Sequence, residues 1–218
     1  LIDDGLVFAH GKKLKLARGL IDARTNFKVN SRTKPSIIYE DANLIVCNKP
    51  YAMDSYMLER QLKAKLIHRL DKTTSGLIAL AKNEDYRAMV LEEFKKNAVY
   101  KEYLCVVKGV VAQELSINSP ISTQKGKRAK SFIDPKGKEA LSIAKPLAVD
   151  GKKTLLSVVI KTGRTHQIRV HLASAGLAIV GDELYGGVSA KRLFLHSYKL
   201  SFLNHSFECK PEASFWQD

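Results

Sequence analysis

Short runs of apolar residues, many of them alternating with polar ones, dominate the hydrophobic pattern of this chain. Runs of this length and pattern are typical of β-strands. The strands predicted in this way span residues 37–39, 44–47, 77–82, 99–107, 140–149, 154–161 and 192–202. Asp150-Gly151 predicts a tight hairpin between two of them. Because few helical segments separate the strands, the pattern favours a mixed α+β domain whose central sheet is mostly antiparallel.

Helical spacing of apolar residues predicts three helices, at residues 56–65, 84–96 and 165–175. Asn83 is suited to cap the start of the second helix, and Gly176 is suited to end the third. Four residues are expected on the buried face of the second helix: Tyr86, Met89, Val90 and Phe94. Residues 119–139 are rich in glycine and lysine and contain two prolines, which predicts a connection of low regularity.

The first part of the chain differs from the rest. Residues 5–13 predict a short strand that turns at a glycine, and a basic stretch, Lys13–Arg18, follows it. The polar, proline-containing hinge at residues 31–36 predicts a boundary, so we expect a small unit at 1–34 and a main domain at 35–218. The alternative is a strand that extends the main sheet. Since Leu1 is not an initiator methionine, we also expect residues to be missing before it.

The charge of the chain points to a polyanionic partner. Lysine and arginine number 36 against 22 aspartate and glutamate residues, which gives a formal net charge of +14. Nucleic acid is the leading candidate for such a partner. A basic surface that only keeps the protein soluble is the alternative, and charge alone does not distinguish RNA from DNA or an anionic membrane.

The three cysteines predict core thiols rather than a metal site. Cys47, Cys105 and Cys209 are widely separated and odd in number, and two of them lie in apolar runs. No paired-cysteine metal pattern, signal peptide or membrane-spanning apolar run is present in the sequence. We therefore expect a cytoplasmic protein without a bound metal.

The most informative segment is residues 68–77, which read His-Arg-Leu-Asp-Lys-Thr-Thr-Ser-Gly-Leu. Its single carboxylate, Asp71, lies in a basic, hydroxyl-rich stretch between a predicted helix and a predicted strand. Loops held by ordered neighbours commonly carry chemistry. Taken alone, an aspartate flanked by Arg69 and Lys72 is more often part of a surface ion pair or a turn than a catalytic group.

Three further segments follow this one in order. They read Lys-Glu-Tyr-Leu-Cys-Val-Val-Lys-Gly at 101–109, Thr-Gly-Arg-Thr-His-Gln-Ile-Arg-Val-His-Leu at 162–172 and Gly-Asp-Glu-Leu-Tyr-Gly at 181–186. Together the four segments resemble the RluA family of pseudouridine synthases, which convert uridine in structured RNA to its carbon-linked isomer. The resemblance covers about residues 37–210 and implies the pseudouridine synthase catalytic fold, with a central cleft.

Two regions relate less simply to this family. Residues 1–34 resemble the C-terminal half of the alpha-L RNA-binding domain that often precedes the catalytic domain, without its first helices. Between Pro50 and His68 the chain is shorter than the family pattern. We expect either a shortened loop or residues missing near Ala52-Met53, and this difference concerns the rim of the site rather than Asp71.

By resemblance, the catalytic residues are Asp71, Tyr103 and Arg169. Asp71 is the reacting group, which either adds covalently to the sugar or base or abstracts the ribose 2′ proton; both routes stay open. A carboxylate in a partly dry pocket needs a nearby cation, and Arg169 matches that partner. Strand alternation puts Tyr103 on one face with Cys105 and Val107, where its ring is expected to stack on the target base.

The resemblance also implies substrate-binding residues. Arg69 matches the residue that inserts where the uridine leaves the stack, and Leu195 matches an apolar pocket residue. His68 either shapes the loop or touches phosphate, and Arg164 is either a phosphate contact or a structural link. Thr73, Thr74 and Ser75 are expected to hold the loop by hydrogen bonds, and Gly76 to permit its turn. A basic cluster that would suit an RNA backbone or form an ordinary solvated loop comprises Lys125, Lys127, Arg128 and Lys130.

The expected partner is therefore RNA, with ribosomal RNA favoured over transfer RNA, and the resemblance implies a monomer that needs no metal or organic cofactor. Two other classes of function fit the sequence less well. A non-catalytic RNA-binding or ribosome-assembly protein on the same scaffold would explain the charge, but it would not need Asp71, Tyr103 and Arg169 together. A DNA-binding regulator would need a helix-turn-helix pattern, and none is found in the sequence.

Overall fold

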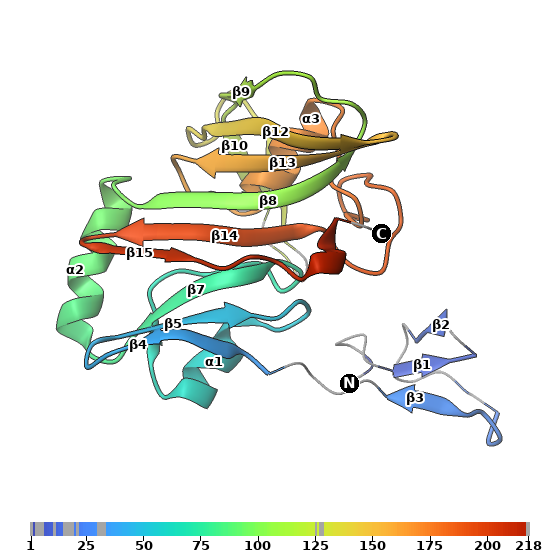
Figure 1. The fold of residues 1–218 in the computed structure, drawn as a ribbon, viewed down its shortest axis with the longest axis horizontal. Helices are drawn as coiled ribbons and strands as arrows, with labels where there is room; N and C mark the ends of the chain where they lie inside the picture. Colours follow the sequence, from blue (N-terminus) through green and yellow to red (C-terminus); the bar gives the residue numbers. More distant parts are fainter. Residues whose placement is uncertain are drawn as a thin grey trace.

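A ten-stranded mixed sheet forms the body of the protein (Figure 1). The computed structural model describes residues 2, 7–10, 12–14, 20, 22–29, 34–124, 126 and 129–216. Along the sheet the strands are β4 (Ser36–Glu40), β5 (Leu44–Lys49), β7 (Ser75–Ala81), β14 (Leu195–Phe202), β8 (Tyr100–Lys108), β13 (Lys153–Ile160), β12 (Ser142–Asp150) and β9 (Leu115–Ile117). Two short strands lie off this path, β6 (Lys65–Leu66) beside β7 and β15 (His205–Glu208) beside β14.

The sheet is mostly antiparallel, as predicted, and the α+β fold class is confirmed. Among the described strand pairs of this sheet, only β7 and β14 run parallel. Gly76 lies at this junction with φ of +109°, and a Cβ on it would lie 2.2 Å from the Ser197 carbonyl oxygen. Glycine is therefore required here for two reasons: its positive φ, in line with the predicted backbone turn, and the close approach of two strands, which the sequence did not predict.

Three α-helices in the described part of the chain lie around the sheet: α1 (Ser55–Leu62), α2 (Glu84–Lys95) and α3 (Gln167–Ser174). The Asn83 side chain accepts a hydrogen bond from the Tyr86 backbone N–H, which confirms the predicted cap of α2. On the face expected to be buried, Val90 is fully buried but Met89 is 54% exposed, so the assignment of Met89 to the core is wrong. Met89 has the spacing expected for the apolar face of a helix, but the part of that face that is buried is narrower than the spacing of apolar residues predicted.

The connection predicted for residues 119–139 is more regular than expected. It contains an antiparallel pair, β10 (Ile121–Gln124) and β11 (Lys130–Ile133). Its glycine and lysine content hid the alternation of buried and exposed residues that such strands normally show. Three members of the predicted basic cluster, Lys125, Lys127 and Arg128, lie outside the described residues.

Both faces of the sheet are buried, and one of them forms the floor of the site. Tyr103, Cys105 and Val107 of β8 share one apolar cluster, whereas Leu104 and Val106 belong to another, which confirms the predicted alternation. All three cysteines are buried and free: Cys47, Cys105 and Cys209. The hairpin of β12 and β13 at Asp150-Gly151 is also confirmed.

The described N-terminal residues form a separate three-stranded sheet, which Figure 1 shows apart from the main sheet. Its strands are β1 (Val7–Ala9), β2 (Lys12–Lys13) and β3 (Phe27–Val29). In the described part of the chain, β1 pairs with β2 and β3 and not with the main sheet. Residues 15–18 of the predicted basic stretch and residues 31–33 of the predicted hinge lie outside the described residues. No described helix is long and apolar enough to cross a membrane.

Candidate active site

A cavity of about 470 Å³ lies between the loop before β7, strand β8 and the start of α3. Its volume is in the range of small-molecule and nucleotide sites. All seven residues that the sequence assigned to the site line it: His68, Arg69, Asp71, Tyr103, Arg164, Arg169 and Leu195. Segments separated by about a hundred residues along the chain therefore meet at one hollow.

Hydrogen bonds to the backbone hold the loop that carries Asp71. The Ser55 hydroxyl, at the start of α1, donates to the Leu70 carbonyl at 2.8 Å and accepts from the Leu70 N–H at 3.2 Å. The Thr74 N–H donates to the Asp71 carbonyl at 3.0 Å, which closes a turn around the carboxylate. Asp71 is thus presented by a loop whose backbone is fixed on both sides.

Lys49, at the end of β5, supports the same loop from inside. Its side chain is fully buried, and its ammonium donates to the carbonyls of Met53 at 2.8 Å, Pro50 at 3.1 Å and Lys72 at 3.4 Å. Burial lowers the pKa of Lys49 to about 7, although the charge of Asp71 acts in the opposite direction. The short turn at residues 51–52 therefore folds over a buried cation that also reaches the loop of Asp71.

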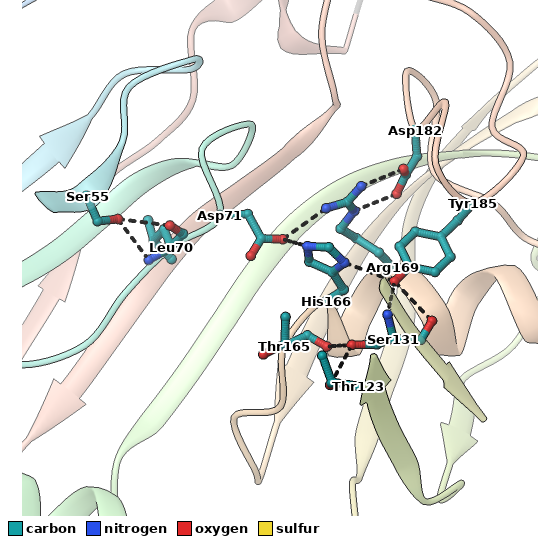
Figure 2. A network of polar contacts seen from close by, with 10 residues as sticks. All are labelled: Ser55, Leu70, Asp71, Thr123, Ser131, Thr165, His166, Arg169, Asp182 and Tyr185. Atoms are coloured by element: carbon teal, nitrogen blue, oxygen red, sulfur yellow. Dashed lines mark hydrogen bonds and ion pairs between the residues drawn. The ribbon is translucent and has the colours of Figure 1, made fainter. Parts of the chain in front are cut away.

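Arg169 joins two carboxylates, as Figure 2 shows. Its Nη1 donates to Asp71 Oδ2 at 3.1 Å, and its Nε and Nη2 donate to the two Asp182 oxygens at 2.7 and 2.8 Å. The Asp182 side chain is 1% exposed and that of Arg169 8%, whereas that of Asp71 is 27% exposed. Burial alone would lower the pKa of Arg169, but the hydrogen bonds and charges of Asp182 and Asp71 raise it.

The start of α3 determines where Arg169 points. His166 precedes the helix with φ of +54°, so α3 begins at Gln167 rather than at Thr165 as the sequence predicted. The Gln167 Oε1 accepts from the Thr162 hydroxyl at 2.8 Å and from the Arg164 N–H at 3.0 Å. These two hydrogen bonds stabilise a compact turn at residues 162–167. Arg169 lies two residues further on, on the buried face of α3.

His166 and Tyr185 complete the surroundings of Arg169 (Figure 2). His166 Nε2 lies 3.6 Å from Asp71 Oδ2, and its Nδ1 lies 2.9 Å from the Tyr185 hydroxyl. The guanidinium of Arg169 lies 5.1 Å from the centre of the Tyr185 ring. Burial lowers the pKa of His166, with Asp71 opposing the shift and Arg169 adding to it.

Tyr103 and Leu195 form the apolar part of the cavity. They are 8% and 3% exposed and lie on the adjacent strands β8 and β14. Burial raises the pKa of Tyr103 to about 12, the charge of Asp71 acts in the same sense, and a hydrogen bond with Ser197 opposes both. The phenol is therefore protonated at neutral pH and offers a flat ring beside the carboxylate.

The remaining predicted residues line other parts of the cavity. Arg69 is exposed and donates to the Tyr56 hydroxyl at 3.0 Å. His68 stacks on Phe94 and accepts from the Ala79 N–H at 3.2 Å, which fits a role in shaping the loop. Arg164 donates through Nε to the Glu139 carbonyl at 2.9 Å.

Sequence reasoning gave no individual role to three residues of this site. Asp182 and His166 appeared only within the segments at 181–186 and 162–172, and Lys49 was given no role. A carboxylate two positions after the apolar run at 177–180 was a signal for Asp182, because a buried carboxylate needs a cation nearby. The burial of Lys49 has no comparable local signal.

Comparison with known proteins now decides the family. Residues 43–174, which contain Asp71, Tyr103 and Arg169, match the family described as RNA pseudouridylate synthase. The chain belongs to this family. A pseudouridine synthase isomerises uridine in RNA, so the predicted enzyme class and RNA substrate are confirmed.

Relatives of this pseudouridine synthase agree in sequence and in structure. An RNA pseudouridine synthase of Helicobacter pylori strain J99 is 48% identical over 219 residues, covering 99% of this chain and 90% of the relative. Ribosomal large subunit pseudouridine synthase D of Borreliella burgdorferi is 37% identical over 76% of this chain and 60% of its own length. The structure of human RNA pseudouridylate synthase domain containing 1 has a TM-score of 0.72 at 26% identity, covering 82% of this chain and 84% of that one.

Proposed function

We propose that this pseudouridine synthase acts on ribosomal RNA and that Asp71 is its catalytic group. The supporting observation is the position of the Asp71 carboxylate. It lies in the cavity, is partly open to a substrate, and is bound at 3.1 Å by Arg169, which is itself fixed by Asp182. A carboxylate held in this way is preorganised for chemistry on a nucleotide that enters the cavity.

The reaction breaks the bond between ribose C1′ and uracil N1 and forms a bond between C1′ and C5. N1 gains a proton and C5 loses one, so atoms and charge balance without an external reactant. Asp71 begins this sequence either by adding to the sugar or base or by removing the ribose 2′ proton. Arg169 stabilises the charged form of Asp71, which is the nucleophile in the first route and the base in the second.

Tyr103 holds the detached base. Its ring lies on the apolar side of the cavity with Leu195, where a flat aromatic surface can contact uracil while the base rotates. Because the pKa of Tyr103 is raised to about 12, the phenol does not act as a free phenolate. Its hydroxyl assists loss of the C5 proton only if it passes its own proton to a neighbouring base.

Arg69 supports extraction of the uridine from folded RNA. Its guanidinium is exposed at the rim and lies 5.7 Å from the Tyr56 ring, so it can move without breaking a buried ion pair. Removing a base from a stack costs a few kcal/mol, and a planar cation can fill the vacated space.

Ribosomal RNA is the proposed substrate because relatives with the same domain are named ribosomal large subunit pseudouridine synthases. The net charge of +14 fits a large RNA partner. Residues 1–34 are proposed as a partial alpha-L RNA-binding unit beside a catalytic domain at 35–218. A monomer in the cytoplasm, where ribosomal RNA and reduced cysteines are found together, fits this assignment.

The test uses transcripts of ribosomal and transfer RNA that carry tritium at uridine C5. Pseudouridine formation releases this tritium to water, so release from the ribosomal transcript and not from transfer RNA is expected. Release from transfer RNA alone would contradict the proposed substrate. Absence of release from both would contradict the activity on these RNAs.

A further inference from the structure

Lys101 is a buried cation in the cavity that the mechanism above does not use. It is 6% exposed and lies on β8 two residues before Tyr103. Residues at this spacing lie on the same face of a strand, roughly 7 Å apart. Lys101 lines the same cavity as Tyr103 and Asp71. A nucleotide whose base contacts Tyr103 would therefore have its sugar and phosphates within reach of Lys101.

No carboxylate among the described residues pairs with Lys101. Its ammonium makes one long contact, 3.4 Å to the Thr162 carbonyl, and lies 5.5 Å from the centre of the Phe94 ring. Burial lowers the pKa of Lys101 to about 8, and the positive charge of Arg164 lowers it further. Glu102, the next residue, interacts with Ser157 and Lys199 instead.

Lys101 has fewer hydrogen-bond acceptors than the other buried cationic side chains near the site. Arg169 has two carboxylates and Lys49 has three carbonyl acceptors, whereas Lys101 has one distant carbonyl and a second cation beside it. A buried charge is costly unless it is paired. Two neighbouring cations that face a cavity are stabilised when an anion enters it.

We propose that Lys101 and Arg164 form a subsite for a backbone phosphate of the RNA, adjacent to the uridine held at Tyr103. This inference rests on the proposed function for its choice of ligand. Gly163, the residue before Arg164, lines the same cavity close to this ammonium: a Cβ on it would lie in ordinary contact, 3.9 Å from Lys101 Nζ. Phosphate is preferred over a carboxylate ligand because the established substrate is RNA.

The test is the salt dependence of binding to a structured ribosomal RNA transcript. Each lost phosphate contact reduces the slope of log affinity against log salt concentration by about 0.7 to 0.9. We expect Lys101→Met to lose this amount, with roughly tenfold weaker binding at low salt. Lys101→Arg should retain the slope. Lys108→Met is the matched control, since Lys108 is exposed at the far end of the same strand, and its slope should equal that of the wild type.

A stability measurement separates this role from a structural one. Methionine keeps the apolar stem of Lys101 and removes an unpaired buried charge, so Lys101→Met should melt at or above the wild-type temperature. An unchanged salt slope, or a lower melting temperature, would overturn the subsite. RNA binding does not require turnover. A wild-type protein that binds the transcript but releases no tritium would therefore contradict the proposed function, while the salt slopes of the variants would still test the subsite.

Discussion

Asp182 fixes Arg169 by two hydrogen bonds, of 2.7 and 2.8 Å, while the third donor group of the guanidinium reaches Asp71. The pair is almost fully buried, so water does not compete for these bonds. Asp182 is therefore a positioning residue: it fixes the guanidinium of Arg169, and that guanidinium holds Asp71.

Asp182→Asn should impair both stability and catalysis. The substitution leaves the buried guanidinium with one charged partner, and we expect the free energy of unfolding to fall by about 3 kcal/mol. The rate constant for tritium release should fall at least tenfold, with a smaller change in RNA affinity. Urea unfolding and single-turnover release measure the two effects, and Asp150→Asn at an exposed hairpin is the control. Full activity in Asp182→Asn would argue against this positioning role.

Lys49→Met should loosen the loop of Asp71. The change removes the donor to the Met53 and Pro50 carbonyls. Because these carbonyls lose that partner, the free energy of unfolding should fall by about 1–3 kcal/mol. Because Lys49 also reaches the Lys72 carbonyl, the maximal turnover rate should fall more than RNA affinity does. Lys65→Met, at an exposed position of β6, should behave as wild type in both assays. Equal losses in the two variants would contradict a specific role for Lys49.

His196 predicts a loss of stability in acid. Its ring is 2% exposed, with Nδ1 2.9 Å from the Ser75 hydroxyl and Nε2 2.8 Å from the Cys209 carbonyl. Burial lowers the pKa of His196 to about 4, below the 6.5 of an exposed histidine. As pH falls through this interval the unfolded chain binds the proton first, so the free energy of unfolding falls.

The expected loss from His196 alone is about 3 kcal/mol between pH 6.5 and pH 4, and this contribution is fully present above pH 6.5. Chemical denaturation across this range measures it. His196→Gln should show a shallower dependence on pH than the wild type, whereas replacing the exposed His10 by Gln should not change it. The same slope in all three proteins would refute the assignment.

Arg69→Ala should discriminate between RNA contexts. If Arg69 fills the space that the uridine leaves, its loss should slow modification of a uridine in a duplex by about tenfold or more, in line with an extraction cost of a few kcal/mol. A uridine in an unpaired loop should be modified at nearly the wild-type rate. Matched transcripts that differ only in pairing at the target make the comparison, and equal slowing on both would be inconsistent with insertion.

Local patterns in the sequence predicted much of this fold. Asn83 caps α2, Asp150-Gly151 forms a hairpin, and the alternation around Tyr103 places its ring on the cavity side. Such features depend on neighbours in the chain, and a sequence displays them directly. The family motifs predicted which seven residues line one cavity.

The features that the sequence did not predict depend on contacts between residues far apart in the chain. The roles of Asp182, Lys49 and Lys101 arise from which groups surround them after folding, and a charged residue in the sequence looks alike whether it becomes buried or exposed. The close contact of Gly76 with the Ser197 backbone was not predicted, because the two residues lie more than a hundred positions apart in the sequence. The strands β10 and β11 were missed because glycine and lysine lower the apparent strand propensity of their surroundings.

In the proposed mechanism the Asp71 carboxylate performs the chemistry, and RNA is bound mainly by other groups. Asp71→Asn keeps the shape of the side chain and removes its charge, so this variant separates catalysis from binding. We predict no detectable tritium release from the ribosomal transcript and RNA affinity within about tenfold of wild type, with Asp85→Asn, at an exposed position in α2, fully active. Release by Asp71→Asn at the wild-type rate would contradict the account.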